Sequence, residues 1–151
     1  MIPLQGVPYI RKAAEILRGD HDISFRIIGD GQWVPYEDLP NLIRAADACL
    51  GIFGDTDKTL RVIPNKVYEA IAMAKPVISS DTPAIRELFT DRENILLCRR
   101  ADPEDLAEKI LELRRDEQLR TRIAHGGHQL FLSRCTPKII AADLLRDLAD
   151  L

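Results

Sequence analysis

Cysteine, aromatic residues and long apolar runs are all scarce in this chain of 151 residues. The three cysteines, Cys49, Cys98 and Cys135, show neither C-x-x-C spacing nor a nearby histidine pair, which argues against a zinc or dithiol motif. An odd cysteine count fits a reducing compartment. No apolar run approaches the roughly 20 residues of a transmembrane helix, and no signal-peptide pattern is present. We therefore expect a soluble, cytoplasmic protein, with attachment to a membrane surface through a missing partner domain left open.

An excess of positive charge is also absent. Lys and Arg number 21 against 24 Asp and Glu, and the formal net charge is -3. Binding to nucleic acid irrespective of its sequence depends on surplus Lys and Arg near phosphates, so we expect no nucleic-acid partner. The arginines between positions 99 and 122 alternate with acids, a pattern that predicts a solvated helix face.

What the chain does have is a regular alternation of short apolar runs with amphipathic segments, over a length that suits one domain. The predicted strands are 23–28, 48–53, 76–80 and 94–98, and the predicted helices are 7–18, 38–46, 65–74 and 83–89. Residues 102–151 are predicted to form a helical tail. Strands that alternate with helices predict an α/β fold, a Rossmann-like parallel sheet of about four strands flanked by helices.

Local signals predict where several helices begin and end. Asp102 is predicted to cap the first helix of the tail, and Asp81 or Thr82 the helix at 83–89. Gly126-Gly127 is predicted to break the tail, and the histidines on either side of this pair are predicted to be solvated.

The segment from Ile63 to Leu88 is the most informative part of the sequence. Pro64 stands where the first helical turn tolerates proline, and the amides of Asn65, Lys66 and Val67 follow it. Glu69 projects from the same turn. A loop that feeds a helix N-terminus, with a carboxylate one turn in, is typical of sites for a nucleotide diphosphate and its ribose.

This segment resembles the nucleotide-sugar-binding domain of retaining glycosyltransferases with the GT-B fold, family 4 type. The matching residues are Pro64, Lys66, Glu69, Ala70, Ala72, Pro76, Val77, Ile78 and Glu87, and three further stretches match in the family's order: IIGDGQ at 27–32, VPYEDLPNLIRAAD at 34–47 and DRENILLC at 91–98. The resemblance implies a single donor-binding domain over residues 1–151. It also implies transfer of a sugar from a nucleoside-diphosphate sugar, such as a UDP- or GDP-sugar, to an acceptor, without a metal or cofactor.

The resemblance assigns roles to single residues. Glu69 would accept hydrogen bonds from the ribose hydroxyls, and Lys66 with the amides of residues 65–67 would hold the diphosphate. Val34 would contact the base through its main chain. Gly29 and Gly31 would let the backbone approach a ligand, although a plain tight turn explains them equally well. The alternative to these binding roles is that Lys66 and Glu69 are ordinary solvated residues near the start of a helix.

Two site positions depart from the family pattern. Arg61 stands where the family often has an acid near the donor sugar. Two interpretations of Arg61 are equally good: it contacts a phosphate, or it is a solvated loop residue. Gln5 stands where the family has a phosphate-binding lysine. Its side chain brings no charge, so we expect weaker phosphate binding than in a typical member.

The predicted sheet is also smaller than the family's six strands. The family's central first strand and one helix–strand unit have no counterpart, which leaves the strand at 23–28 without its usual neighbour. The sequence leaves three alternatives open. The remaining strands pair directly with one another, a partner such as a second copy supplies a strand, or the chain is a fragment or shortened form from which the N-terminal acceptor domain is missing. A non-catalytic binding module of the same fold is the main alternative function. A receiver-type signalling domain would need more clustered acids than Asp30 and Asp81.

Overall fold

The core of the fold is a small parallel sheet. The computed structural model describes residues 3–28 and 34–149. Three strands pair in the order β1-β2-β3, where β1 is Cys49–Leu50, β2 is Val77–Ser80 and β3 is Leu96–Cys98. Both pairings are parallel, with Leu50 opposite Ile78 and Ile78 opposite Leu96. The predicted α/β class with a parallel, Rossmann-like sheet is confirmed.

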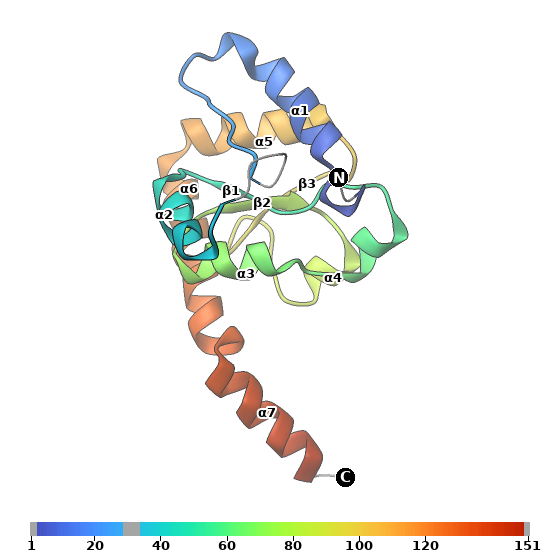
Figure 1. Cartoon of the computed structure of the whole chain (residues 1–151), viewed down its shortest axis with the longest axis vertical. Coiled ribbons are helices and arrows are strands. Elements are labelled where there is room, and N and C mark those ends of the chain that lie inside the picture. Colours follow the sequence, from blue (N-terminus) through green and yellow to red (C-terminus); the bar gives the residue numbers. More distant parts are fainter. Residues whose placement is uncertain (1–2, 29–33, 150–151) are drawn as a thin grey trace.

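Helices cover both faces of this sheet. α1 (Val7–Ile16) and α5 (Pro103–Arg115) lie on one face, whereas α3 (Asn65–Ala72) and α4 (Pro83–Arg86) lie on the other (Figure 1). The side chains of successive strand residues point to opposite faces of the sheet. Val77 joins the core under α3, and Ile78 joins the core under α1 and α5. All four residues of β2 are buried, as expected for a central strand covered on both sides.

The remaining elements connect or extend this core. Four short 3-10 turns and one helix belong to the first half of the chain: η1 (Pro3–Gln5), η2 (Leu17–Gly19), η3 (Tyr36–Asp38), α2 (Leu39–Ala45) and η4 (Asp57–Arg61). α6 (Glu117–Leu130) packs on α5 and α3, and a π-helical turn, η5 (Phe131–Cys135), leads into α7 (Pro137–Ala149). Figure 1 shows α7 extending away from the body of the domain. Within the described ranges, no helix combines the length and apolarity needed to cross a bilayer.

Residues 23–28 do not form the predicted strand, so the described sheet has three strands where about four were expected. The side chains still alternate. Ile23, Phe25 and Ile27 pack against the core under α1 and α5, and the residues between them are exposed. A strand needs a neighbour to accept and donate its backbone hydrogen bonds. The family's central first strand would be that neighbour, and the described strands include no counterpart of it.

The predicted helix break at Gly126-Gly127 is wrong, because both glycines lie inside α6. A Cβ on Gly126 would lie 2.2 Å from the carbonyl oxygen of Glu93, and one on Gly127 would lie 2.9 Å from Cγ2 of Ile71. Glycine therefore lets α6 pack directly on the loop before β3 and on the end of α3. His128 Nδ1 lies 3.1 Å from the carbonyl oxygen of Ile71, and since a carbonyl only accepts, this nitrogen carries the proton. The prediction of a solvated side chain is wrong for His128.

Two predicted helix caps are confirmed. The Thr82 hydroxyl oxygen accepts the amide of Ile85 at 3.2 Å, and Asp102 Oδ1 accepts the amide of Asp105 at 2.9 Å. Such caps satisfy amides that have no partner inside the helix. They fix the starts of α4 and α5 directly after β2 and β3.

Candidate functional site

The loops that follow the three strands meet at one edge of the sheet. Since the strands are parallel, their carboxyl ends lie together, to the right of the sheet in Figure 1. Residues 51–64 lead from β1 to α3, residues 81–82 lead from β2 to α4, and residues 99–102 lead from β3 to α5. Helix starts therefore surround this carboxyl edge, which is where open α/β sheets bind their ligands.

α3 begins at the carboxyl edge without a side-chain cap. Its N-cap residue is Pro64, whose extended backbone carries no capping group. The amide of Val67 donates to the carbonyl oxygen of Pro64 at 3.0 Å and is therefore already engaged. The amides of Asn65 and Lys66 have no acceptor in the described part of the chain. The predicted cradle of three amides is thus reduced to two, and both are free for an anion.

The Lys66 side chain is half-buried without a counter-ion. Burial lowers the pKa of its ammonium group from 10.5 to about 8. Among the residues that the structure describes, no carboxylate lies within ion-pair distance of this group. An unpaired, partly desolvated charge is unfavourable. A bound anion would relieve this cost.

Glu69 lies one turn further along α3 and is half-buried. Residues three and four apart are neighbours on a helix surface, so Glu69 shares one side of α3 with Asn65 and Lys66. The other side of α3 carries Val67, Ala70 and Ile71, which are buried in the core. The helix therefore presents a carboxylate, an ammonium group and an amide side chain on the side that is not packed.

Gln5 lies at the same edge, beside the end of β1. The carbonyl oxygens of Leu4 and Gln5 accept the amides of Gly54 at 3.2 Å and Phe53 at 3.3 Å. Gly6 follows with a φ of 67°, and a Cβ there would lie 2.5 Å from the carbonyl carbon of Phe53. Only glycine permits both this left-handed conformation and this close approach. The backbone thus places Gln5 against the loop that follows β1.

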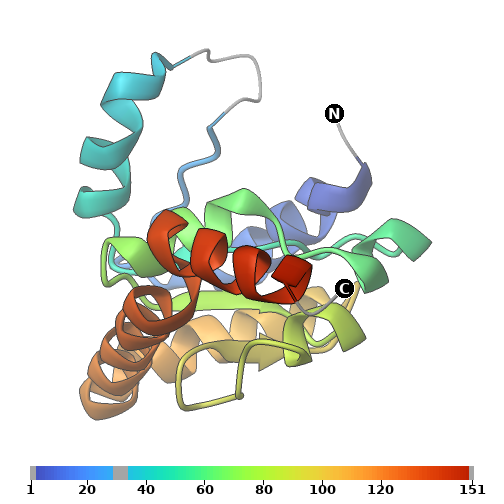
Figure 2. The ribbon, with the colours of Figure 1, turned by 90° about the horizontal axis from the view of Figure 1, so that it is seen from below.

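The other predicted site residues are less closely gathered. Arg61 is exposed and ends η4, shortly before the start of α3. Val34 precedes η3, and Figure 2 shows η3 and α2, in teal, standing away from the sheet at the end opposite η4. Gly29 and Gly31 lie outside the described residues. The structure therefore places Arg61 close in sequence to the α3 start and does not bring Val34 to it.

Sequence reasoning missed a cluster that ties the loop after β1 to α1 and to the loop after β3. The Tyr9 hydroxyl donates to Asp55 Oδ2 at 3.1 Å, and Arg100 Nη1 lies 3.5 Å from the carbonyl oxygen of Thr56. Partial desolvation and Asp55 raise the pKa of Tyr9, while the charge of Arg100 acts in the opposite direction. Arg99 and Arg100 precede α5, so the prediction of a helix face is wrong for them. The only signal in the sequence was two arginines directly after a predicted strand.

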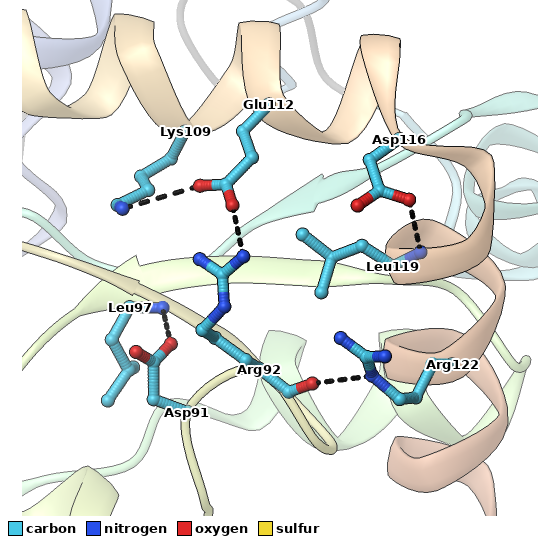
Figure 3. A network of polar contacts seen from close by, with 8 residues as sticks. All are labelled: Asp91, Arg92, Leu97, Lys109, Glu112, Asp116, Leu119 and Arg122. Atoms are coloured by element: carbon cyan, nitrogen blue, oxygen red, sulfur yellow. Dashed lines mark hydrogen bonds and ion pairs between the residues drawn. The ribbon is translucent and has the colours of Figure 1, made fainter.

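The opposite edge of the sheet carries a network of paired charges (Figure 3). An Arg92 Nη atom lies 2.5 Å from Glu112 Oε1, and Lys109 Nζ lies 3.4 Å from Glu112 Oε2. Burial raises the pKa of Glu112, but Arg92 and Lys109 outweigh it and hold that pKa below its usual value. Arg122 Nε donates to the carbonyl oxygen of Arg92 at 3.0 Å. This network fastens the loop before β3 to α5 and α6.

Two open hollows of the described surface lie away from the carboxyl edge. One lies over α6, beside Thr121 and His125, and the other lies over α5, beside Leu111 and Arg115. In the described part of the chain, no group of three or more His, Cys, Asp or Glu side chains is placed to hold a metal ion.

Comparison with known sequences points to one family. The family described as glycosyl transferase-like matches residues 9–146. An uncharacterised glycosyltransferase of Methanocaldococcus jannaschii is 30% identical over 146 residues, which cover 85% of this chain and 40% of that protein. The chain thus spans less than half the length of this curated relative.

Solved structures show the same fold. The C-terminal domain of a glycosyl transferase group 1 family protein (LpcC) from Francisella tularensis superposes with a TM-score of 0.71 at 19% identity, over 91% of this chain and 83% of that one. The Anabaena protein HepE, solved in complex with UDP-glucose, superposes with a TM-score of 0.74 at 17% identity, over 100% of this chain and 47% of that one. The likeness identifies a GT-B domain of the C-terminal type.

Proposed function

This chain belongs to the glycosyl transferase-like family, and we propose that it is the donor-binding domain of a retaining glycosyltransferase of the family 4 type. The proposed substrate is a nucleoside-diphosphate sugar, from which the enzyme transfers the sugar to an acceptor. The chain spans 40% of its relative from Methanocaldococcus jannaschii. In this proposal the acceptor site lies on an N-terminal domain outside the chain.

The observation that supports the proposal best is the start of α3. A diphosphate needs N–H donors and a cation, and the free amides of Asn65 and Lys66 lie at the positive end of a helix dipole. The Lys66 ammonium group is partly desolvated and has no partner within the described residues. A bound diphosphate supplies the missing counter-charge. The same contacts would stabilise the negative charge that develops on the diphosphate as the sugar departs.

Glu69 is proposed to hold the ribose. A carboxylate has two oxygens and can accept a hydrogen bond from each of two neighbouring hydroxyls. Glu69 lies one turn along α3 from the two free amides and is half-buried, which shields such bonds from water. This arrangement sets the distance between the diphosphate and the ribose by the pitch of one helical turn.

The nucleotide is proposed from the structural neighbours together with the resemblance. HepE has been solved with UDP-glucose and with UDP and glucose. UDP-sugars are therefore the first donors to test and GDP-sugars the second. Gln5 supplies no charge at a position where the family has a lysine, so binding to the isolated chain is expected to be weak.

Calorimetry with UDP and uridine tests the role of Glu69. We expect Glu69→Gln to weaken the binding of both ligands about tenfold, because a hydrogen bond to a charged group contributes about 1.5–3 kcal/mol. Glu15→Gln, on an exposed position of α1, is the matched control and should bind like the wild type. Equal affinity of wild type and Glu69→Gln would remove the ribose role.

Sugar transfer tests the domain assignment. The chain alone should transfer no sugar from UDP- or GDP-sugars, because its carboxyl edge forms only one wall of the site. Adding a separately produced N-terminal domain of a full-length relative should restore transfer, measured as nucleotide release. Transfer by the chain alone would contradict the proposal.

A non-catalytic binding module of the same fold is the second candidate. Gln5 and Arg61 favour it, because they remove a cation and an acid that the family uses for the donor. Calorimetry also separates the two functions, since a module that has lost its donor should release no heat at millimolar UDP or GDP.

A further inference from the structure

The chain has no cation at position 5, but Gln5 and the cation of Arg100 contact the same loop, the one that follows β1. The Gln5 carbonyl oxygen accepts the amide of Phe53, and the residues that follow Phe53 form the loop after β1. Two residues further along this loop, Asp55 contacts Tyr9, and Thr56 contacts Arg100. Gln5, the loop after β1 and Arg100 thus form one continuous group, although they come from three separate segments.

The two adjacent arginines after β3 differ in how their charges are used. Arg99 Nε lies 2.9 Å from Asp102 Oδ2 and 3.7 Å from Asp105 Oδ2, so its charge is compensated. Arg100 makes no ion pair within the described residues, and its contact with Thr56 is a single bond of 3.5 Å to a neutral carbonyl group. A bond of that length is weak. Most of the five N–H donors of its guanidinium group therefore have no acceptor among the residues that the structure describes.

The acid in this group is already engaged. Asp55 accepts the Tyr9 hydroxyl at 3.1 Å, whereas no ion pair joins Asp55 to Arg100 within the described residues. Arg100 is half-buried, and its charge reaches Tyr9, which lies in the first turn of α1 just after Gln5 and Gly6. The positive charge of Arg100 thus acts on the Tyr9 hydroxyl, whose residue follows Gln5 by four positions in the chain.

We propose that Arg100 is a donor-binding residue whose guanidinium group contacts the diphosphate and replaces the charge that Gln5 does not supply. A guanidinium group offers two parallel N–H donors to a phosphate. The diphosphate would then be held between a cation after β3 and the Lys66 end of α3. The inference rests on the proposed function and extends it to a residue that the family resemblance does not assign.

Calorimetry on the full chain with UDP, uridine and inorganic pyrophosphate tests this proposal. Arg100→Gln should weaken UDP binding about tenfold and leave uridine binding unchanged, because only the diphosphate loses a charge-assisted bond. Arg100→Lys should retain part of the affinity, since it keeps the charge and loses the paired donors. Arg99→Gln is the matched control and should bind UDP like the wild type. Thermal melting of each variant reports whether the fold is intact.

The outcomes separate this proposal from the proposed function. If Arg100→Gln binds UDP as tightly as the wild type, or loses uridine affinity to the same extent, Arg100 only holds the loop and the inference fails. If the wild type binds pyrophosphate through Arg100 but binds neither UDP nor GDP, the anion contact stands and the donor-binding function fails. If the wild type binds none of these ligands, both are overturned.

Discussion

The two edges of the sheet differ in whether every half-buried cation has an acidic partner. At the amino edge, where the strands begin, Glu112 pairs with both Arg92 and Lys109, and the carbonyl oxygen of Arg92 accepts a bond from Arg122 (Figure 3). At the carboxyl edge, Lys66 and Arg100 are half-buried and have no carboxylate partner in the described chain. Because a desolvated charge without a partner costs stability, the difference supports our proposal that the carboxyl edge binds a ligand, whereas the paired charges of the amino edge stabilise the fold.

The largest effect on the amino edge should come from Gly126→Ala. Its Cβ would lie 2.2 Å from the carbonyl oxygen of Glu93, a backbone atom that cannot move without shifting the loop before β3. We expect a loss of about 2 kcal/mol in the free energy of unfolding, as is usual for overpacking. Urea denaturation measures it. Gly19→Ala, where the new Cβ meets no atom within 4 Å, is the control, and an equal loss there would refute the packing argument.

Lys66→Met should move stability and binding in opposite directions. The substitution removes a desolvated cation and keeps an apolar side chain of similar length, so the melting temperature should rise. The affinity for UDP should fall about tenfold, since the charged donor to the diphosphate is lost. Thermal melting measures the melting temperature, and calorimetry on the same samples measures the affinity for UDP. A variant that loses stability as well would make Lys66 part of the fold, like the residues of the amino edge.

Both the stability and the UDP affinity of the wild type should depend on pH through the ionisation of Lys66. The pKa of Lys66 is about 8 in the folded chain and 10.5 as its ordinary value. Between these values the unfolded chain binds more protons, so the contribution of Lys66 to stability rises with pH across that window. UDP binding should weaken as pH rises through about 8, because only the ammonium form attracts the diphosphate. Both trends should be flatter in Lys66→Met.

The smallest effect is expected for Glu112→Gln at the amino edge. Arg92 is about half exposed, so losing its pair with Glu112 should cost about 0.5–1 kcal/mol. The pKa of Glu112 is lowered in the fold, and its contribution is therefore present above the ordinary value of 4.5 and is lost as pH falls through the lowered value. Acid denaturation of wild type and variant measures the difference. UDP affinity should be unchanged, and a loss would remove the distinction between the two edges.

Those parts of the fold that depend on local signals were predictable from the sequence. The amphipathic pattern of residues 7–18 predicted α1, and the Asp102 cap predicted the start of α5. The strand at 23–28 was predicted wrongly, because pairing depends on a neighbour elsewhere in the chain. The glycines of α6 were also misinterpreted, since their close contacts come from Glu93 and Ile71.

In the candidate site, too, local features were predictable and contacts between distant segments were not. The placement of Asn65, Lys66 and Glu69 on the first turns of α3 was predictable, because proline and the apolar spacing define that helix. Their roles in donor binding stay predictions. Arg100 was not predictable as part of this region, since its position follows from a contact with Thr56, forty-four residues earlier in the chain.

The conformation of Gly6 limits which substitutions the chain can tolerate at position 6. Its left-handed backbone sets both the first turn of α1 and the position of the neighbouring Gln5 against Phe53. Replacement by any other amino acid would displace the start of α1 and the neighbouring Gln5, even though residue 6 has no side chain that could contact a substrate. In a saturation scan scored for growth or turnover, this codon should therefore tolerate as few changes as a residue that contacts the donor directly.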